Sequence, residues 1–166
     1  MFAGNFLKIK NILSVPKIFK CIYEDYKNVE FWMIGDGKYR YQIEETSMGL
    51  PIKFWGNQNP ENMPDFINCA DVQILPSLNE GLPLTMVEAL RCGCNAVGSL
   101  VGGIPEVIGE ENCVSLKEGD FEKKIANKVV SFLENADVKK QILDVKFDWN
   151  YTAMKEHKYI KEIINL

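Results

Sequence analysis

The sequence predicts an α/β domain built on a doubly wound parallel sheet. Short apolar segments of strand length alternate with longer segments whose apolar residues recur at helical spacing. Glycine or proline follows most of the short segments, as expected where strands end. Strands that are apolar along their whole length are buried on both faces, so we expect helices on both sides of the sheet. The 166 residues fit a single domain, and no repeat or linker divides them.

The first half of the chain is expected to contribute three strands and three helices. Ser14 is a suitable N-cap for the first helix, with Pro16 in its first turn. Gly49 is expected to end the second helix, and Asn59 to cap the third. The predicted order is a strand at 2–3, a helix from 15 to about 26, a strand at 29–34, a helix at 39–48, a strand at 52–55 and a helix from 60 to about 69.

The second half continues the alternation with three more strands, which makes about six in total. The last third of the chain is helical by its apolar spacing. One domain is therefore expected over residues 1–166, with 147–166 as its C-terminal helix. The predicted order is a strand at 72–75, a helix at 84–91, a strand at 95–97, a short helix from 105, a strand at 114–116 and helices at 121–134, 138–146 and 151–164.

Composition excludes several classes of function. A net charge of -4 and a pI of about 5.1 argue against a broad nucleic-acid-binding face, which would be basic. The five cysteines form no regular framework, which indicates reduced thiols in a cytoplasmic protein. Cys92 and Cys94 are too close in sequence for the usual zinc-ligand spacing, and the single histidine, His157, is far away. We therefore predict no metal site.

Targeting signals are not apparent. No segment approaches the roughly 20 apolar residues of a membrane span, and no signal-peptide pattern opens the chain. The chain begins inside a predicted strand, so we expect the natural protein to continue upstream of Met1. A complete small protein is the alternative.

The most informative segment runs from Pro76 to Leu90. It contains a loop with Glu80 and Gly81, and then a predicted helix that carries Glu88. Gly81 allows a ligand to approach the backbone, and the unpaired N–H groups that open a helix favour a phosphate. Carboxylates on both sides of that position can accept hydrogens from sugar hydroxyls. The segment therefore predicts a ligand with a diphosphate between two polyols, such as a nucleotide-sugar.

This segment resembles the E-x7-E motif of the group 1 (family 4) retaining glycosyltransferases, with Glu80 and Glu88 at the acidic positions. One such pair is a weak signal, but the matches run in family order over nearly the whole chain. The resemblance implies the C-terminal, donor-binding half of a GT-B enzyme, which is Rossmann-like, with the N-terminal acceptor domain absent from this chain. The other matches are Gly35-Asp36-Gly37, Phe54-Trp55-Gly56, Ala70-Asp71, Leu75-Pro76-Ser77, residues 101–106 and Phe147-Asp148-Trp149.

The resemblance also implies roles for individual residues. Glu80 contacts the donor sugar and forms the catalytic set with Lys10, while Glu88 contacts the ribose. Backbone amides near Gly81 and Leu82 hold the distal phosphate and the sugar. The full set of expected donor-binding positions is Gly4, Lys8, Lys10, Gly81, Leu82, Glu88, Gly102, Gly103 and Trp55.

Asn5 is the clearest departure from the family pattern. An arginine usually follows the glycine that ends the first strand, and here Asn5 follows Gly4. Lys8 can substitute spatially, but lysine lacks the planar fork of arginine. We expect this exchange to affect affinity for the diphosphate.

Each candidate also has an ordinary structural interpretation. The two carboxylates can be solvated, Lys10 can be a surface lysine, and Gly102-Gly103 can be a simple turn. Trp55 and Phe54 are expected to be core residues rather than base-stacking ones, although backbone groups at the end of their strand can still contact the base edge. His157 lies among charged residues on the last predicted helix and receives no catalytic role.

The resemblance implies a mechanism without a metal or other cofactor. The substrate is a UDP-sugar or GDP-sugar, and the domain stabilises the negative charge that develops on the leaving diphosphate. Retention of configuration is expected through front-face attack on the sugar. A glycan or lipid-linked acceptor binds through the N-terminal domain, so the isolated chain should bind donor with negligible transfer. The expected location is the cytoplasm, with peripheral attachment of the full-length enzyme to the inner membrane face.

Three rival functions remain open at this point. A dinucleotide-dependent oxidoreductase requires G-x-G-x-x-G after the first strand, where this chain has the single glycine Gly4. A nucleotide-sugar epimerase of the GT-B type matches the loop 101–106 in part, but fits the Glu80–Glu88 spacing less well. A nucleotide-binding module without catalytic activity, or one that has lost donor binding, is supported by Asn5.

Overall fold

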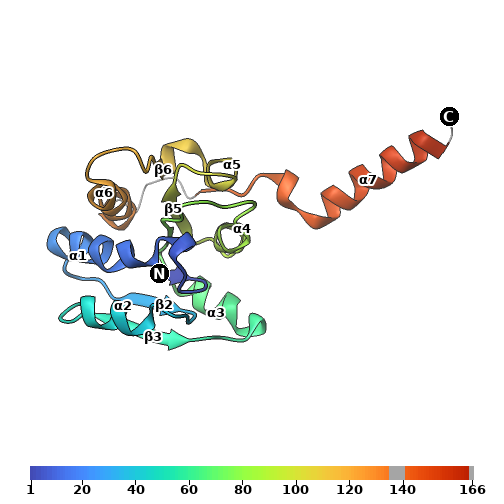
Figure 1. Ribbon diagram of the computed structural model, residues 1–166. Helices are drawn as coiled ribbons and strands as arrows, with labels where there is room; N and C mark the ends of the chain where they lie inside the picture. Colours follow the sequence, from blue (N-terminus) through green and yellow to red (C-terminus); the bar gives the residue numbers. More distant parts are fainter. Residues whose placement is uncertain (135–140, 165–166) are drawn as a thin grey trace.

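A computed structural model describes residues 1–134 and 141–164 of the chain (Figure 1). Its helices and strands alternate in the order that the sequence predicts. The strands are β1 (Phe2–Ala3), β2 (Phe31–Ile34), β3 (Ile52–Gly56), β4 (Val72–Leu75), β5 (Asn95–Ser99) and β6 (Cys113–Val114). The α-helices are α1 (Val15–Asp25), α2 (Arg40–Thr46), α3 (Met63–Asn68), α4 (Leu84–Arg91), α5 (Ile104–Ile108), α6 (Phe121–Glu134) and α7 (Trp149–Ile164).

All strand pairs are parallel, which confirms the predicted sheet type. The strands form two three-stranded sheets, in the orders β1-β2-β3 and β4-β5-β6. Met1 connects them, because its amino group donates to the Val72 carbonyl and its carbonyl accepts from the Ile74 amide at 2.8 Å. The described strands therefore follow the order β3-β2-β1-β4-β5-β6, which is the Rossmann order.

Helices cover both faces of these sheets. Helix α1 packs against α6, and on the opposite face α4 packs against α3 and α5. The inner side of α1 consists of Ile18, Phe19 and Ile22, which are at most 1% exposed. Every residue of β4 is buried, as expected for a strand covered on both faces. The strands are therefore held firmly in the core, and the loops that follow them emerge at defined positions.

Two predicted helix starts differ in detail. Ser14 precedes α1, but its hydroxyl donates to the Asn11 carbonyl at 2.8 Å instead of capping a helix amide. A 3-10 turn over Ile12–Ser14 leads directly into α1, so the chain is already coiled before the helix begins. Asn59 likewise precedes a 3-10 turn over Pro60–Asn62, makes no side-chain cap, and α3 begins only at Met63.

The predicted helix at 138–146 is wrong where it can be compared. Residues 138–140 lie outside the described residues, residues 141–144 are not helical, and Val145–Phe147 is a 3-10 turn. Gln141 accounts for the lack of a helix here, because its side-chain amide donates to the Ala96 carbonyl at 2.9 Å and its side-chain oxygen accepts from the Ala96 amide. Strand β6 pairs only with Gly98 and Ser99, so Gln141 satisfies the part of β5 that β6 leaves open.

The chain ends in a helix that contributes nothing to the described core. Helix α7 extends away from the rest of the domain (Figure 1), and no residue of it is buried. It begins at Trp149, between residue 147, given as the start of the C-terminal helix, and residue 151, where the apolar spacing placed its start. Residues 165–166 lie outside the described part of the chain. Within the described residues, no helix has the length and apolar character needed to cross a membrane.

Candidate functional site

The two halves of the strand order meet between β1 and β4. From β1 the chain proceeds outward through β2 and β3, and from β4 it proceeds outward in the opposite direction through β5 and β6. Loops that leave adjacent parallel strands on either side of such a reversal form the usual ligand crevice of this fold. Here those loops carry Lys10, after β1, and Glu80, after β4.

Lys10 and Glu80 form an ion pair at this crevice. The Lys10 Nζ lies 2.7 Å from the Glu80 Oε1, and the two side chains are 27% and 9% exposed. The Ser77 hydroxyl donates to the same oxygen at 2.6 Å. The backbones of the two loops are also joined, because the Leu78 amide donates to the Ile9 carbonyl at 2.8 Å. The structure thus brings together the two residues that the sequence assigned to catalysis.

Gly102 and Gly103 pack closely against the backbone of the Glu80 loop. A Cβ atom on Gly102 would lie 1.7 Å from the Glu80 carbonyl oxygen, and one on Gly103 would lie 2.3 Å from the Gly81 carbonyl oxygen. The Gly103 amide donates to that Gly81 carbonyl at 2.9 Å. Backbone packing therefore accounts for both glycines, and their predicted contact with a ligand stays a prediction.

The opening turn of α4 faces solvent. Helix α4 starts at Leu84 without a side-chain cap, and a Cβ atom added to Gly81 would meet nothing within 4 Å. Among the described residues, the amides of Gly81, Leu82 and Thr85 donate to no partner. Leu82 and Leu84 are 51% and 56% exposed beside these amides. The turn is not plugged by side chains, and its N–H groups can receive an anion.

Glu88 lies on the exposed side of α4, one turn beyond Leu84. The other face of this helix is buried through Met86, Val87, Ala89 and Leu90, so Glu88 cannot point into the core. Partial burial nevertheless raises the pKa of the Glu88 carboxyl above its usual value. No described residue pairs with this carboxylate, which leaves it able to accept hydrogen bonds from a ligand.

The loop after β1 places the remaining predicted cations. Gly4 has a positive φ of 147° and its amide donates to the Ile34 carbonyl at 3.0 Å, which turns the chain away from the strand. Lys8 and Lys10 occupy the two ends of one 3-10 turn. Lys8 and Asn5 are exposed, and neither side chain has an ion pair or hydrogen bond within the described residues. Whether Lys8 contacts a phosphate stays a prediction.

Trp55 belongs to an aromatic cluster rather than to the Lys10–Glu80 pair. Its ring meets those of Trp32 and Phe66 edge-on, at centroid distances of 5.4 and 5.1 Å. It is still 39% exposed, so it is not the core residue that the sequence favoured, because β3 is an edge strand of the sheet. Phe54 faces the opposite side, where Arg40 covers its ring at 4.6 Å.

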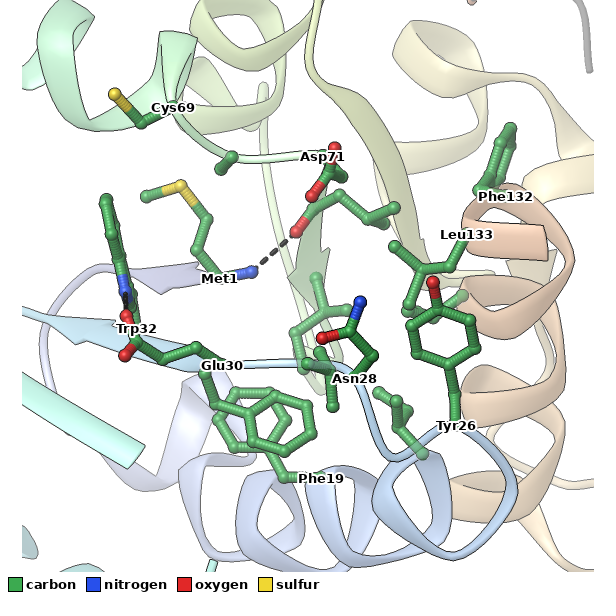
Figure 2. Close-up of a pocket in the computed structure, with 17 residues that line it drawn as sticks. Met1, Phe19, Tyr26, Asn28, Glu30, Trp32, Cys69, Asp71, Phe132 and Leu133 are labelled. Atoms are coloured by element: carbon green, nitrogen blue, oxygen red, sulfur yellow. Dashed lines mark hydrogen bonds between the residues drawn. The ribbon is translucent and has the colours of Figure 1, made fainter. Parts of the chain in front are cut away.

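A pocket of about 490 Å³ lies at the other edge of the sheet (Figure 2). Met1, Glu30 and Asp71 line it where β1, β2 and β4 begin, together with Phe132 and Leu133 from the end of α6. None of the predicted site residues contributes to its wall. Ligands of parallel α/β sheets bind where the strands end, so this pocket is not the predicted donor site.

Cysteines do not form a second centre. Burial raises the pKa of the Cys94 thiol to about 11 and that of Cys113 to about 12, so both stay protonated near neutral pH. Within residues 1–134 and 141–164, no group of three or more His, Cys, Asp or Glu residues is arranged to hold a metal ion.

Two serines of the site received no role in the sequence analysis, although Ser77 belongs to one of the matching segments. Ser77 and Ser99 are both completely buried, and the Ser99 hydroxyl donates to the Ser77 carbonyl. A serine in a loop or at a strand end is common, so the residue types alone do not indicate that Ser77 holds Glu80 or that Ser99 holds Ser77. Only the proximity of β4 and β5 in the sheet brings them together.

Comparison with known proteins connects this geometry to a family. A sequence profile described as "Glycosyl transferases group 1" matches residues 1–135. The chain belongs to this family. The match covers every predicted site residue, including both members of the Lys10–Glu80 pair. The chain accordingly has the fold of the C-terminal domain of a GT-B glycosyltransferase.

Individual group 1 relatives and solved structures agree with this assignment. N-acetyl-alpha-D-glucosaminyl L-malate synthase of Bacillus anthracis is 25% identical over 163 residues, which cover 96% of this chain and 42% of that protein. Sucrose-phosphate synthase from Thermosynechococcus elongatus has a TM-score of 0.79 at 19% identity, covering 99% of this chain and 45% of its own. Anabaena HepE, crystallised with UDP, has a TM-score of 0.67 at 17% identity, covering 82% and 39%. This group 1 chain thus spans less than half the length of each.

Proposed function

We propose that this group 1 glycosyltransferase domain binds a nucleotide-sugar with its diphosphate at the N-terminus of α4. The observation that carries the proposal is the Lys10–Glu80 pair, 2.7 Å apart, beside the open amides of Gly81, Leu82 and Thr85. Unpaired amides and the helix dipole favour an anion, and the Lys10 ammonium adds a positive charge. One of its three N–H groups bonds Glu80, which leaves others for phosphate oxygens.

The two carboxylates define the polyol positions on either side of the diphosphate. Glu80 is held at the crevice floor and is proposed to accept hydrogens from the transferred sugar. Glu88 is free of described partners and lies one turn along α4, where it is proposed to accept from the ribose hydroxyls. This arrangement orients the donor with the sugar over the Lys10–Glu80 pair.

The chemistry proposed for the site is electrostatic. Cleavage of the sugar–phosphate bond places negative charge on the nucleoside diphosphate, and preorganised donors stabilise that charge without rearranging. Lys10 and the α4 amides supply those donors, so the proposed mechanism requires no metal. Transfer is also proposed to retain the anomeric configuration, as the resemblance to the retaining glycosyltransferases implies. The leaving phosphate assists deprotonation of the acceptor as the new bond forms on the same face.

The donor and acceptor of the whole enzyme are also proposals. Anabaena HepE was crystallised with UDP, which supports a UDP-sugar over the GDP alternative. The Bacillus relative is named for N-acetylglucosaminyl transfer to L-malate, so UDP-N-acetylglucosamine is a sensible first donor to test. A glycan or lipid-linked acceptor is proposed to bind the other GT-B domain, with the enzyme in the cytoplasm at the inner membrane face. The described chain alone is expected to bind donor and to transfer negligibly.

Calorimetric titration tests the donor-binding proposal directly. UDP and UDP-N-acetylglucosamine should bind with and without EDTA, whereas NAD should not. Glu88→Ala should weaken both ligands, because both contain the ribose. Glu45→Ala is the matched control, since Glu45 is an exposed helical carboxylate on α2.

Other results would point to a different function. If UDP, GDP, UDP-sugars and GDP-sugars all fail to bind, the proposal is rejected. That result would favour a module that has lost donor binding, which is the hypothesis that Asn5 supports. Tight binding of NAD would favour an oxidoreductase. Formation of an epimer from UDP-N-acetylglucosamine would favour the epimerase hypothesis.

A further inference from the structure

The Glu80 carboxylate is held asymmetrically. Lys10 Nζ at 2.7 Å and the Ser77 hydroxyl at 2.6 Å both donate to Oε1. Among the described residues, Oε2 accepts no hydrogen bond. Two donors on one oxygen fix the side-chain rotamer and also orient the second oxygen.

Ser77 is itself anchored by the core. It is completely buried, and its carbonyl accepts from the hydroxyl of Ser99 at the end of β5. The next amide, that of Leu78, donates to Ile9 at 2.8 Å, so the Ser77 segment is joined to the loop that carries Lys10. The donor that orients Glu80 is therefore more rigid than the exposed loop around it.

We propose that Ser77 is the positioning residue for donor-sugar recognition: with Lys10 it occupies Oε1 of Glu80 and thereby presents Oε2 to a sugar hydroxyl. Ser77 is buried and does not touch the ligand. Its effect should therefore appear only in the part of the affinity that the sugar adds to UDP. This inference rests on the proposed function, because it assigns the sugar to Glu80.

The free-energy cost of restricting the Glu80 side chain gives the expected size of the effect. Losing the Ser77 donor leaves Glu80 with one fixed contact instead of two, so sugar binding must again restrict the carboxylate. Immobilising a flexible side chain costs about 0.5–1.5 kcal/mol, which corresponds to about two- to twelvefold in affinity. Binding of UDP alone does not use Oε2 and should be nearly unchanged.

The test compares UDP with UDP-glucose and UDP-N-acetylglucosamine by calorimetry on wild type and Ser77→Ala. The measured quantity is the ratio of the Kd for UDP to the Kd for the better UDP-sugar. Ser77→Ala should lower this ratio about two- to twelvefold with little change in the Kd for UDP. Ser47→Ala is the matched control, because Ser47 is 4% exposed and its hydroxyl has no hydrogen-bond partner. It should leave the ratio unchanged.

Ser77→Cys serves if the alanine variant does not fold, since it is nearly isosteric and its S–H is a weak donor. An unchanged ratio in a folded Ser77 variant would overturn the inference, as would a wild-type ratio of one. Equal losses for UDP and UDP-sugar would show that Ser77 acts only on the loop structure, which also overturns it. If wild type binds none of the nucleotides, the proposed function itself fails, a distinct result.

Discussion

Gly81 and Gly103 face each other across one hydrogen bond, and alanine should have opposite effects at the two positions. A Cβ atom on Gly103 would lie 2.3 Å from the Gly81 oxygen, whereas ordinary contacts begin at 3.4 Å. The two backbone segments must then separate by about an ångström, which breaks the 2.9 Å bond from the Gly103 amide to the Gly81 carbonyl. A Cβ atom on Gly81 meets nothing within 4 Å.

The expected magnitudes follow from these distances. For Gly103→Ala, overpacking costs about 1–3 kcal/mol and the lost hydrogen bond about 1, offset by about 0.5 from the less flexible unfolded chain. The net loss of about 2.5 kcal/mol lowers the Tm of a chain this size by about 5–10 °C. Gly81→Ala should raise stability by about 0.4–1 kcal/mol through the unfolded state alone. Its methyl group, however, projects where a phosphate is proposed to approach the backbone.

Thermal unfolding and calorimetry together separate the two glycines. Gly103→Ala should melt earlier than wild type, and Gly81→Ala should melt at the same temperature or later while binding UDP more weakly. An unchanged Tm for Gly103→Ala would refute the packing argument. Unchanged UDP affinity for Gly81→Ala would refute the placement of the phosphate beside that residue.

Three further predictions use other parts of the chain. Burial raises the pKa of Glu88, so its carboxylate form is lost earlier than usual on acidification. The affinity for UDP should therefore fall as the pH drops from neutral toward about 4.5. Glu88→Gln should bind UDP more weakly, and its affinity should change less with pH. That raised pKa also means that ionised Glu88 destabilises the fold as pH rises through it, so Glu88→Gln should not lower the Tm at pH 7. Asn5→Arg should tighten UDP binding by about tenfold through a charge-assisted contact, and Asn5→Lys by less; no gain for either would place Asn5 away from the phosphate. Exposed Cys69 should react first with a thiol reagent, whereas buried Cys94 and Cys113 should react only on unfolding, and their early labelling would contradict the described packing.

Local signals in the sequence were sufficient to predict the sheet and most helices. A buried strand such as β4 is recognised by a short run of apolar residues, and its end by the glycine or proline that follows it. Both signals lie in adjacent residues, so they can be read without the structure. The helix predicted at 138–146 is absent over residues 141–144, because the Gln141 side chain pairs with Ala96, a contact across more than forty residues that periodicity cannot reveal. Trp55 was misjudged for a similar reason, since its exposure depends on β3 being at the sheet edge.

The same contrast between local signals and long-range contacts applies to the candidate site. Glu80, Gly81 and Glu88 belong to one contiguous segment, and the sequence identified them together. The Lys10–Glu80 pair joins residues seventy positions apart, and only the resemblance to a family suggested it beforehand. The Ser77–Glu80 hydrogen bond is local, because the two residues are three positions apart in one loop. The anchoring of Ser77 by Ser99 and the packing role of Gly102, however, depend on how the segments that end β4 and β5 meet, and nothing local in the sequence encodes that meeting.

The central claim is that the diphosphate binds where β1 and β4 end. Backbone amide NMR on the labelled 18.9 kDa chain, titrated with UDP, tests it most directly. The largest chemical-shift changes are expected at the amides of Gly81, Leu82 and Thr85, with smaller ones near Lys10. Shifts concentrated instead around Trp32 and Asp71, at the pocket on the opposite edge (Figure 2), would contradict it.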